Sequence, residues 1–212
     1  MLNGLKLRLT LLSSTCITVD NNPFILFSKW MALAIKNEPN DPNAMCLSTV
    51  DGDGHPSSRI VLLKDYDDNG FVFFTNSQSQ KGQELAENQN VALGFHWKSL
   101  LKQIRINGIA KIIPREETTK YFHSRARESQ IASYASLQSQ PLPDKRIYED
   151  KINAVREQFK NEENIPCPDH WNGYRVTPSK MEFWTQKDYR THDRFVYTPD
   201  HDDIWSKERL YP

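Results

Sequence analysis

The feature that most constrains the fold of this chain is a short apolar run with a cation at each end, residues 59–64. Four consecutive branched apolar residues lie between Arg59 and Lys64, and turn-forming residues stand on both sides of the run. A run of this kind is typical of a fully buried strand, so we expect a central strand here. The rest of the chain is then expected to build a sheet around it.

The two charged ends of this run indicate a ligand. Burying a strand with a guanidinium at its start and an ammonium at its end is unfavourable unless anions meet both groups. The sequence therefore favours a phosphate-bearing ligand that lies along the strand. The alternative is that Arg59 and Lys64 are solvated residues at the ends of a core strand, since charged side chains are mostly exposed.

Short apolar or alternating runs recur along the chain, and each predicts a strand. The further runs cover residues 45–50, 71–75, 91–97, 102–113, 174–177, 180–185, 194–197 and 204–209. Tight turns join the first three strands in chain order, which predicts an antiparallel meander. The expected fold class is mainly β with flanking helices (α+β).

Helices are expected at four places between these strands. Asn22 before Pro23 is typical of a helix start, and apolar residues recur on one face of the segment that follows. Further helices are predicted over residues 76–88, from residue 114 toward residue 129, and over residues 144–160. We expect one domain, residues 23–212, because chains of this length commonly remain single.

The bulk composition excludes several classes of function. Lysine plus arginine and aspartate plus glutamate both number 27, so the chain lacks the positive field that non-specific nucleic-acid binding needs. Its three cysteines are far apart, without the spacing of a metal site or a disulfide framework, which fits a reducing compartment and a cytoplasmic location. No apolar run approaches the ~20 residues of a membrane span.

The first 22 residues form a poorly defined arm. Lys6 and Arg8 precede the first acidic residue, Asp20, and serine and threonine are frequent, which faintly resembles a targeting segment. The apolar part is short and no clear cleavage site follows it. A loosely ordered N-terminal arm is the favoured interpretation.

Two helical segments carry candidate phosphate ligands. Lys81 lies in the first turns of a helix that follows a strand, where free N–H groups and the helix dipole favour an anion. Tyr121, Arg125 and Ser129 are spaced by four, so on a helix that continues or resumes they converge on one spot. Their donors suit a phosphate monoester. The alternatives are a surface lysine and an exposed polar helix face.

The segment after Trp184 gathers further groups that bind anions and planar rings. If the chain is extended there, Arg190, His192 and Arg194 point to the same side. A lone histidine is more often structural than catalytic, but two flanking arginines make the two interpretations about equal.

Eight short motifs fall in one order along the chain, and together they resemble the pyridoxamine 5′-phosphate oxidase family from about residue 23 to residue 212. They are residues 59–64, 79–82, 103–108, 121–125, 174–178, 182–184, 190–194 and 208–212. The resemblance implies an FMN-binding split β-barrel of Greek-key antiparallel strands. It also implies a homodimer, with FMN held across the interface, that oxidises pyridoxine or pyridoxamine 5′-phosphate to pyridoxal 5′-phosphate with O₂ and releases hydrogen peroxide.

The same resemblance implies a set of site residues. It gives FMN contacts to Arg59, Ile60, Val61, Leu62, Leu63, Lys64, Phe74, Thr75, Lys81, Gln103, Gln138, Ser139, Trp184 and Arg194. It gives the substrate phosphate to Lys64, Tyr121, Arg125 and Ser129. Arg190 and His192 are implied to bind the pyridine side of the substrate and to act in catalysis. No metal is implied.

The chain departs from the family pattern at a few places. Gln80 stands where an arginine is usual, so one expected cation on the FMN phosphate is missing. Phe74 replaces a common tyrosine and Ala132 a usual glycine. The arginine-rich segment that folds over the substrate in many members is not recognisable in residues 1–22.

Two other functions compete with an oxidase. A split-barrel protein could hold FMN or pyridoxal phosphate without turnover, but such a binder needs the phosphate sites and not Arg190 and His192. A flavin reductase that uses a nicotinamide lacks support, since the sequence contains no glycine-rich dinucleotide fingerprint.

Overall fold

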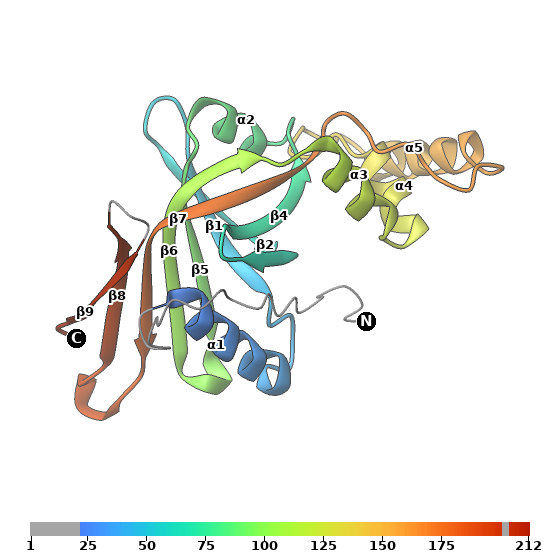
Figure 1. The fold of residues 1–212 in the computed structure, drawn as a ribbon. Coiled ribbons are helices and arrows are strands. Elements are labelled where there is room, and N and C mark those ends of the chain that lie inside the picture. Colours follow the sequence, from blue (N-terminus) through green and yellow to red (C-terminus); the bar gives the residue numbers. More distant parts are fainter. Residues whose placement is uncertain (1–21, 201–203) are drawn as a thin grey trace.

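A single antiparallel sheet dominates the computed structural model, which describes residues 22–200 and 204–212. Seven strands follow the order β2-β1-β5-β6-β7-β4-β3, and β8 and β9 continue the sheet from β7 (Figure 1). The strands are β1 Ala44–Val50, β2 Pro56–Leu62, β3 Asp65–Asp67, β4 Gly70–Asn76, β5 Asn90–Trp97, β6 Lys102–Ile112, β7 Trp171–Thr185, β8 Asp193–Pro199 and β9 Trp205–Leu210.

The sheet curls into a half-barrel. Its two end strands, β2 and β3, are separated in the chain only by Leu63 and Lys64, so the ends of the strand order must lie near each other. The backbone N–H of Lys64 donates to the carbonyl of Val72 on β4 at 2.8 Å, which fixes this approach. The predicted class, mainly β with flanking helices in a split barrel, is confirmed.

The position of the run at residues 59–64 differs from the prediction. We expected a fully buried central strand, but β2 stands at an end of the strand order and alternates between exposed and half-buried positions. Ile60 is 67% exposed, whereas Leu63, one residue beyond the strand, is fully buried. The prediction was wrong because apolar character does not tell whether a strand faces the core of its own chain or another surface.

Two other strand predictions need correction. The meander was wrong at its third strand, since β4 pairs with β3 and β7, and β3 lies where only an acidic turn was expected. The two strands predicted at residues 174–177 and 180–185 are one strand, β7. A register shift opposite Gly108 accommodates Pro178, whose missing N–H cannot continue a regular ladder.

Five helices are found in the described part of the chain, with two short 3₁₀ turns. The helices are α1 Pro23–Asn37, α2 Gln80–Glu87, α3 Arg115–His123, α4 Arg127–Ala135 and α5 Lys145–Gln158, and the turns are η1 Lys98–Leu100 and η2 Asp188–Arg190. The helix predicted from residue 114 to residue 129 is broken at residues 124–126 and resumes as α4. The start of α2 lies later than expected because Ser79, not Asn76, caps it.

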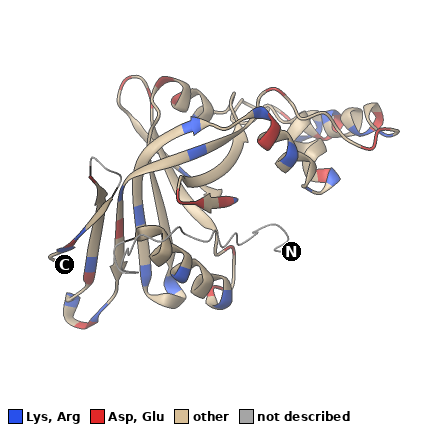
Figure 2. Ribbon diagram, in the orientation of Figure 1, with Lys and Arg blue, Asp and Glu red and all other residues tan. Residues whose placement is uncertain are grey.

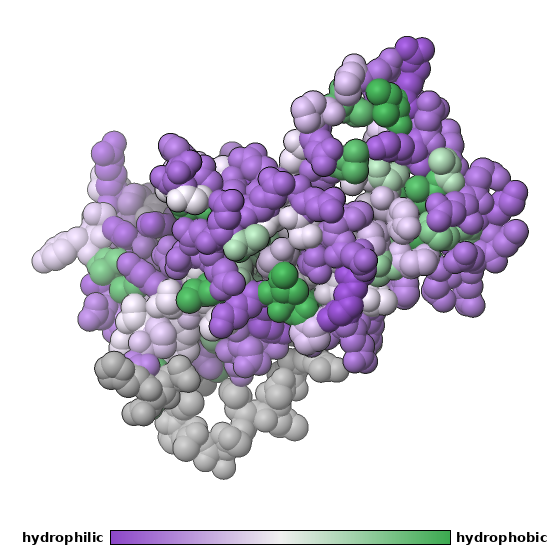
Figure 3. Space-filling model, turned by 90° about the horizontal axis from the view of Figure 1, so that it is seen from above, coloured by the Kyte–Doolittle hydropathy of each residue, from purple (hydrophilic) through white to green (hydrophobic). Residues whose placement is uncertain are grey.

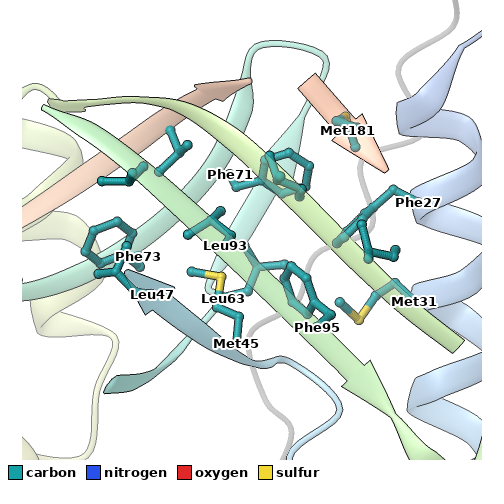
Figure 4. Close-up of a cluster of buried hydrophobic side chains, with 14 of the residues drawn as sticks. Phe27, Met31, Met45, Leu47, Leu63, Phe71, Phe73, Leu93, Phe95 and Met181 are labelled. Carbon is teal, nitrogen blue, oxygen red and sulfur yellow. The ribbon is translucent and has the colours of Figure 1, made fainter. Parts of the chain in front are cut away.

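Two hydrophobic clusters hold these elements together. In the larger cluster Phe27 and Met31 of α1 meet side chains of the sheet, among them Phe71 and Phe95 (Figure 4). The smaller cluster lies under α3, α4 and α5 and includes Trp171. These three helices gather at one end of the sheet, away from α1 (Figure 1).

The surface carries mixed charge. Lysine and arginine are interspersed with aspartate and glutamate over the ribbon (Figure 2), and the face seen from above is mostly hydrophilic with small hydrophobic patches (Figure 3). Among the described residues no helix is long and apolar enough to span a membrane. The predicted N-terminal arm lies outside the described residues, apart from Asn22.

Candidate functional site

A cavity of about 650 Å³ opens where β2 and β4 face the helices α3, α4 and α5. Its walls come from segments that are far apart in the sequence. The lining residues are Arg59, Ile60, Val61, Leu62, Lys64, Phe74, Thr75, Asn76, Lys81, Tyr121, Arg125, Ser129, Ala132, Ser133, Ser136, Gln138, Tyr148 and Trp171. The structure therefore brings together most of the residues, up to residue 138, that were predicted to contact FMN or the substrate phosphate.

Lys64 and Arg125 form one pair of like charges in this cavity. Burial lowers the pKa of Lys64, and the nearby Arg125 guanidinium lowers it further. Burial also lowers the pKa of Arg125. Two cations held near each other and partly out of water gain most from an anion placed between them.

Neighbouring side chains hold Arg125 of this pair in place. Arg125 Nη1 donates to Ser133 Oγ at 2.8 Å, and its guanidinium carbon lies 5.0 Å from the Trp171 ring centroid. Tyr121 stacks on Phe74 with ring centroids 4.1 Å apart, and Phe74 stacks on Trp171 at 5.1 Å. Burial raises the pKa of Tyr121, so its phenol remains a hydrogen-bond donor.

Lys81 and Arg59 form the second pair. Lys81 is only 8% exposed, and its ammonium donates to Ser79 Oγ at 3.1 Å and to Gln138 Oε1 at 3.2 Å. Burial lowers the pKa of Lys81, Arg59 lowers it further, and Glu84 acts in the opposite direction. The cavity thus contains two separate places that suit an anion.

The residues of the second pair fit the phosphate end of FMN by their chemistry. The hydrogen bonds of the Lys81 ammonium go to neutral oxygens, so its charge is available to a phosphate. Thr75 Oγ1 donates to Gln138 Oε1 at 3.4 Å, which gathers further polar groups there. Ile60 and Leu62 of β2 add apolar wall for a planar ring system, and both are exposed.

A second group of predicted residues lies apart from the cavity, where β6, β7 and β8 run side by side. Gln103 is paired with Trp184, and Trp184 with Arg194, across the three strands. The rings of Trp184 and His192 have centroids 4.7 Å apart. The lining of the cavity, as the described residues form it, includes none of these residues and not Arg190.

The predicted geometry of residues 190–194 was wrong. Arg190 belongs to the turn η2, and both Tyr189 and Arg190 have a positive φ, at 53° and 60°. The strand β8 begins only at Asp193, so Arg190, His192 and Arg194 do not alternate along one extended segment. The reason is that Asp188–Arg190 form a 3₁₀ turn before the strand starts, and no glycine in the sequence indicates a turn there.

Two further predicted FMN residues lie next to the cavity but not in its lining. The side chain of Leu63 is buried in the larger hydrophobic cluster, so its side chain faces the core. Ser139 lines a neighbouring cavity of about 360 Å³ together with Gln138. Its φ of 72° places it in a tight turn.

Sequence reasoning missed several residues that line the cavity or support the side chains that line it. Ser133 continues the spacing of four from Arg125 and Ser129, and that pattern could have found it. Trp171 has no such signal, because it meets Arg125 only through the tertiary fold. Glu84, which binds Arg59, was missed because a glutamate on a short helix resembles an ordinary surface residue.

The fold and the cavity together define a class: a split-barrel protein whose cavity suits phosphate-bearing ligands. A family model described as "Pyridoxamine 5'-phosphate oxidase" matches residues 31–159, and one described as "Pyridoxine 5'-phosphate oxidase C-terminal dimerisation region" matches residues 171–212. The chain belongs to the pyridoxamine 5′-phosphate oxidase family.

Relatives and solved structures agree with this assignment. Proteins named pyridoxine/pyridoxamine 5′-phosphate oxidase are 50% identical in Caulobacter vibrioides, over 91% of this chain and 86% of the relative. In Novosphingobium aromaticivorans the identity is 52%, over 90% of this chain and 94% of the relative. The structure of PhzG from Burkholderia lata 383, in complex with tetrahydrophenazine-1-carboxylic acid, has a TM-score of 0.85 and 32% identity, covering 91% of this chain and 93% of that one.

Proposed function

We propose that this chain is a pyridoxine/pyridoxamine 5′-phosphate oxidase, which uses FMN and O₂ to form pyridoxal 5′-phosphate and hydrogen peroxide. The observation that carries the proposal is the pair of like-charged pairs in one cavity, Lys64 with Arg125 and Arg59 with Lys81. One pair suits the phosphate of the cofactor and the other that of the substrate. The names of the relatives, which share about half of the sequence, support the same reaction.

The residues of the first pair act on the substrate phosphate. Lys64 and Arg125 supply charge, and the hydroxyls of Tyr121 and Ser129 line the same cavity. Binding energy gained at the phosphate, remote from the reacting carbon, fixes the position of the pyridine ring. Arg59 and Lys81 would hold the phosphate of FMN, and the cofactor would supply the electron acceptor for that carbon, with O₂ as the final oxidant.

His192 and Arg190 orient the pyridine ring, and His192 handles a proton. His192 Nδ1 accepts a hydrogen bond from the Lys187 N–H at 3.2 Å, which assigns the ring proton of the neutral imidazole to Nε2. Nε2 is then the atom that can donate to a substrate group.

The active unit is proposed to be a homodimer with FMN across the interface. Arg190 and His192 belong to the matched dimerisation region, and the cavity lined by the described residues of one chain does not include them. A second copy of the chain can bring its own turn to this cavity. The two described cysteines, Cys46 and Cys167, are free, which supports a cytoplasmic location.

An absorbance spectrum followed by turnover tests this function. The purified protein is expected to be yellow and dimeric, and to form pyridoxal 5′-phosphate when pyridoxine 5′-phosphate is added under air. A colourless monomer that cannot be reconstituted with FMN contradicts the proposal. A protein that binds FMN but gives no product points to a non-catalytic FMN- or pyridoxal-phosphate-binding protein instead.

A further inference from the structure

A buried carboxylate lies behind the cofactor end of the cavity. Glu84 of α2 is 6% exposed, and hydrogen bonds reach it from β1, β2 and its own helix. Ser57 Oγ lies 2.7 and 2.8 Å from its two oxygens, and Gln80 Nε2 donates to Oε1 at 2.8 Å. Thr49 Oγ1 donates to Oε2. Glu84 itself is not part of the cavity lining.

Arg59 is the link between this carboxylate and the cavity. Its Nη2 donates to Glu84 Oε2 at 3.0 Å and to Ser57 Oγ at 2.6 Å, while Nη1 donates to Thr49 Oγ1. The side chain of Arg59 is 19% exposed and lines the cavity. A guanidinium fixed on one side in this way has already lost its rotamer freedom before a ligand arrives.

The Glu84 side chain is an ionised carboxylate at neutral pH. Burial alone would raise the pKa of this carboxyl, but hydrogen bonds from Thr49, Ser57, Gln80 and Arg59 lower it to about 2. The ionised carboxylate also raises the pKa of Lys81, against the effects of burial and of Arg59. One anion thus supports two cations, which leaves the cavity wall with an excess positive charge.

We propose that Glu84 is a positioning residue for the cofactor: it holds the Arg59 guanidinium in place for the phosphate of FMN. This inference rests on the proposed function. It opposes the simplest electrostatic expectation, in which a carboxylate near a phosphate site only repels the ligand. The direction in which a substitution of Glu84 changes the affinity for FMN distinguishes the positioning role from simple repulsion.

The test titrates apo-protein with FMN and follows the quenching of flavin fluorescence, in the unmodified full chain and in three variants of it. Glu84→Gln removes the charge and keeps the shape. Glu87→Gln is the matched control, because Glu87 is exposed on the same helix and its Oε2 accepts only a backbone hydrogen bond from Gly52 at 2.9 Å among the contacts described. Ser57→Ala is the milder second variant, since it removes one hydroxyl that joins Arg59 to Glu84.

Glu84→Gln is expected to weaken FMN binding by about tenfold or more, because a charge-assisted hydrogen bond that orients the ligand-binding group is lost. Ser57→Ala weakens it less, and Glu87→Gln leaves it unchanged. Riboflavin, which lacks the phosphate, is the second probe, and its affinity is expected to stay the same in all forms. A general distortion of the cavity would weaken both ligands alike and would contradict the positioning role.

Two outcomes overturn the inference or the function separately. If Glu84→Gln binds FMN as tightly as the unmodified chain, or more tightly, Glu84 does not position Arg59 for the phosphate, whatever the enzyme does. Should Glu84→Gln fail to fold, unchanged FMN affinity in Ser57→Ala contradicts the inference instead. If the unmodified apo-protein binds no FMN, the proposed function itself is wrong.

Discussion

The cavity wall and the turn at residues 186–192 use the same kinds of side chain but differ in how firmly they are held. In the wall, Arg59, Lys81 and Arg125 each have hydrogen-bond partners that fix them before a ligand binds. In the turn, Tyr189 is 97% exposed and Arg190 is exposed as well. The difference indicates that contacts within one chain hold the cations of the wall, whereas Tyr189 and Arg190 of the turn remain exposed.

Backbone strain sharpens this contrast. Tyr189 and Arg190 both have a positive φ without being glycine, a conformation that costs roughly 1–3 kcal/mol per residue. The described cavity lining has no such residue. Strain of this kind concentrates at functional sites, where the surroundings hold it in place. The turn is therefore strained where the lining of the cavity is not.

The largest expected effect comes from the turn. Arg190→Ala or His192→Ala should lower turnover by about 100-fold or more, as for the loss of a group that orients substrate or transfers a proton, and leave the flavin content unchanged. Steady-state kinetics and the flavin absorbance of the same preparations measure both. Arg146→Ala, which removes an exposed arginine paired with Asp144 on α5, serves as the control. Equal loss of FMN in the two turn variants would mean that these residues hold the cofactor.

The two cation pairs of the wall are expected to act on different ligands, Lys64 with Arg125 on the substrate and Arg59 with Lys81 on FMN. Arg125→Met is expected to raise the KM for pyridoxine 5′-phosphate by about 10- to 100-fold with FMN affinity unchanged, because one charge-assisted contact to a phosphate is lost. Lys81→Met is expected to weaken FMN binding by a similar factor. Titration of apo-protein and steady-state kinetics distinguish the two variants. If both variants change both quantities to the same degree, the cavity holds one anion site and not two.

The smallest expected effect concerns Gln80. Gln80→Arg should tighten FMN binding by about tenfold, because it restores a cation near the phosphate and ~1.4 kcal/mol corresponds to a tenfold change. The gain should shrink at high salt, which screens the pair. In the structure Gln80 is exposed and donates to Glu84, four residues along the helix, so an arginine there is also drawn to that carboxylate. Unchanged affinity at low salt would show that position 80 does not act on the phosphate.

Local spacing predicted much of the cavity wall. Tyr121, Arg125 and Ser129 reach one cavity as their spacing of four predicted, even though the helix breaks between α3 and α4. The position of Lys81 near a helix start was also informative, since its neighbours in the chain fix its surroundings. Assignment of these residues to particular ligands remains a prediction that came from the family resemblance.

What spacing could not give are contacts that only the tertiary fold creates. Trp171 supports Arg125, and Glu84 supports Arg59, from segments distant in the sequence. The place of β2 at an end of the sheet, with Ile60 exposed, was equally hidden, because an apolar run has the same composition whether it faces a core or a ligand. The left-handed turn at Tyr189 could not be predicted, because the sequence has no glycine there that would indicate it.

Mixed dimers test the central claim most directly, namely that the cavity of one chain works with the turn of a second copy. Arg125→Met and Arg190→Ala chains, carrying different tags, are produced together and the mixed dimer is isolated. At substrate concentrations well below the raised KM of Arg125→Met, each variant alone is expected to be nearly inactive, but the mixed dimer contains one intact site, so it is predicted to recover about half of the normal turnover. A mixed dimer as inactive as its two parents would contradict the account, because the cavity and the turn would then belong to the same chain.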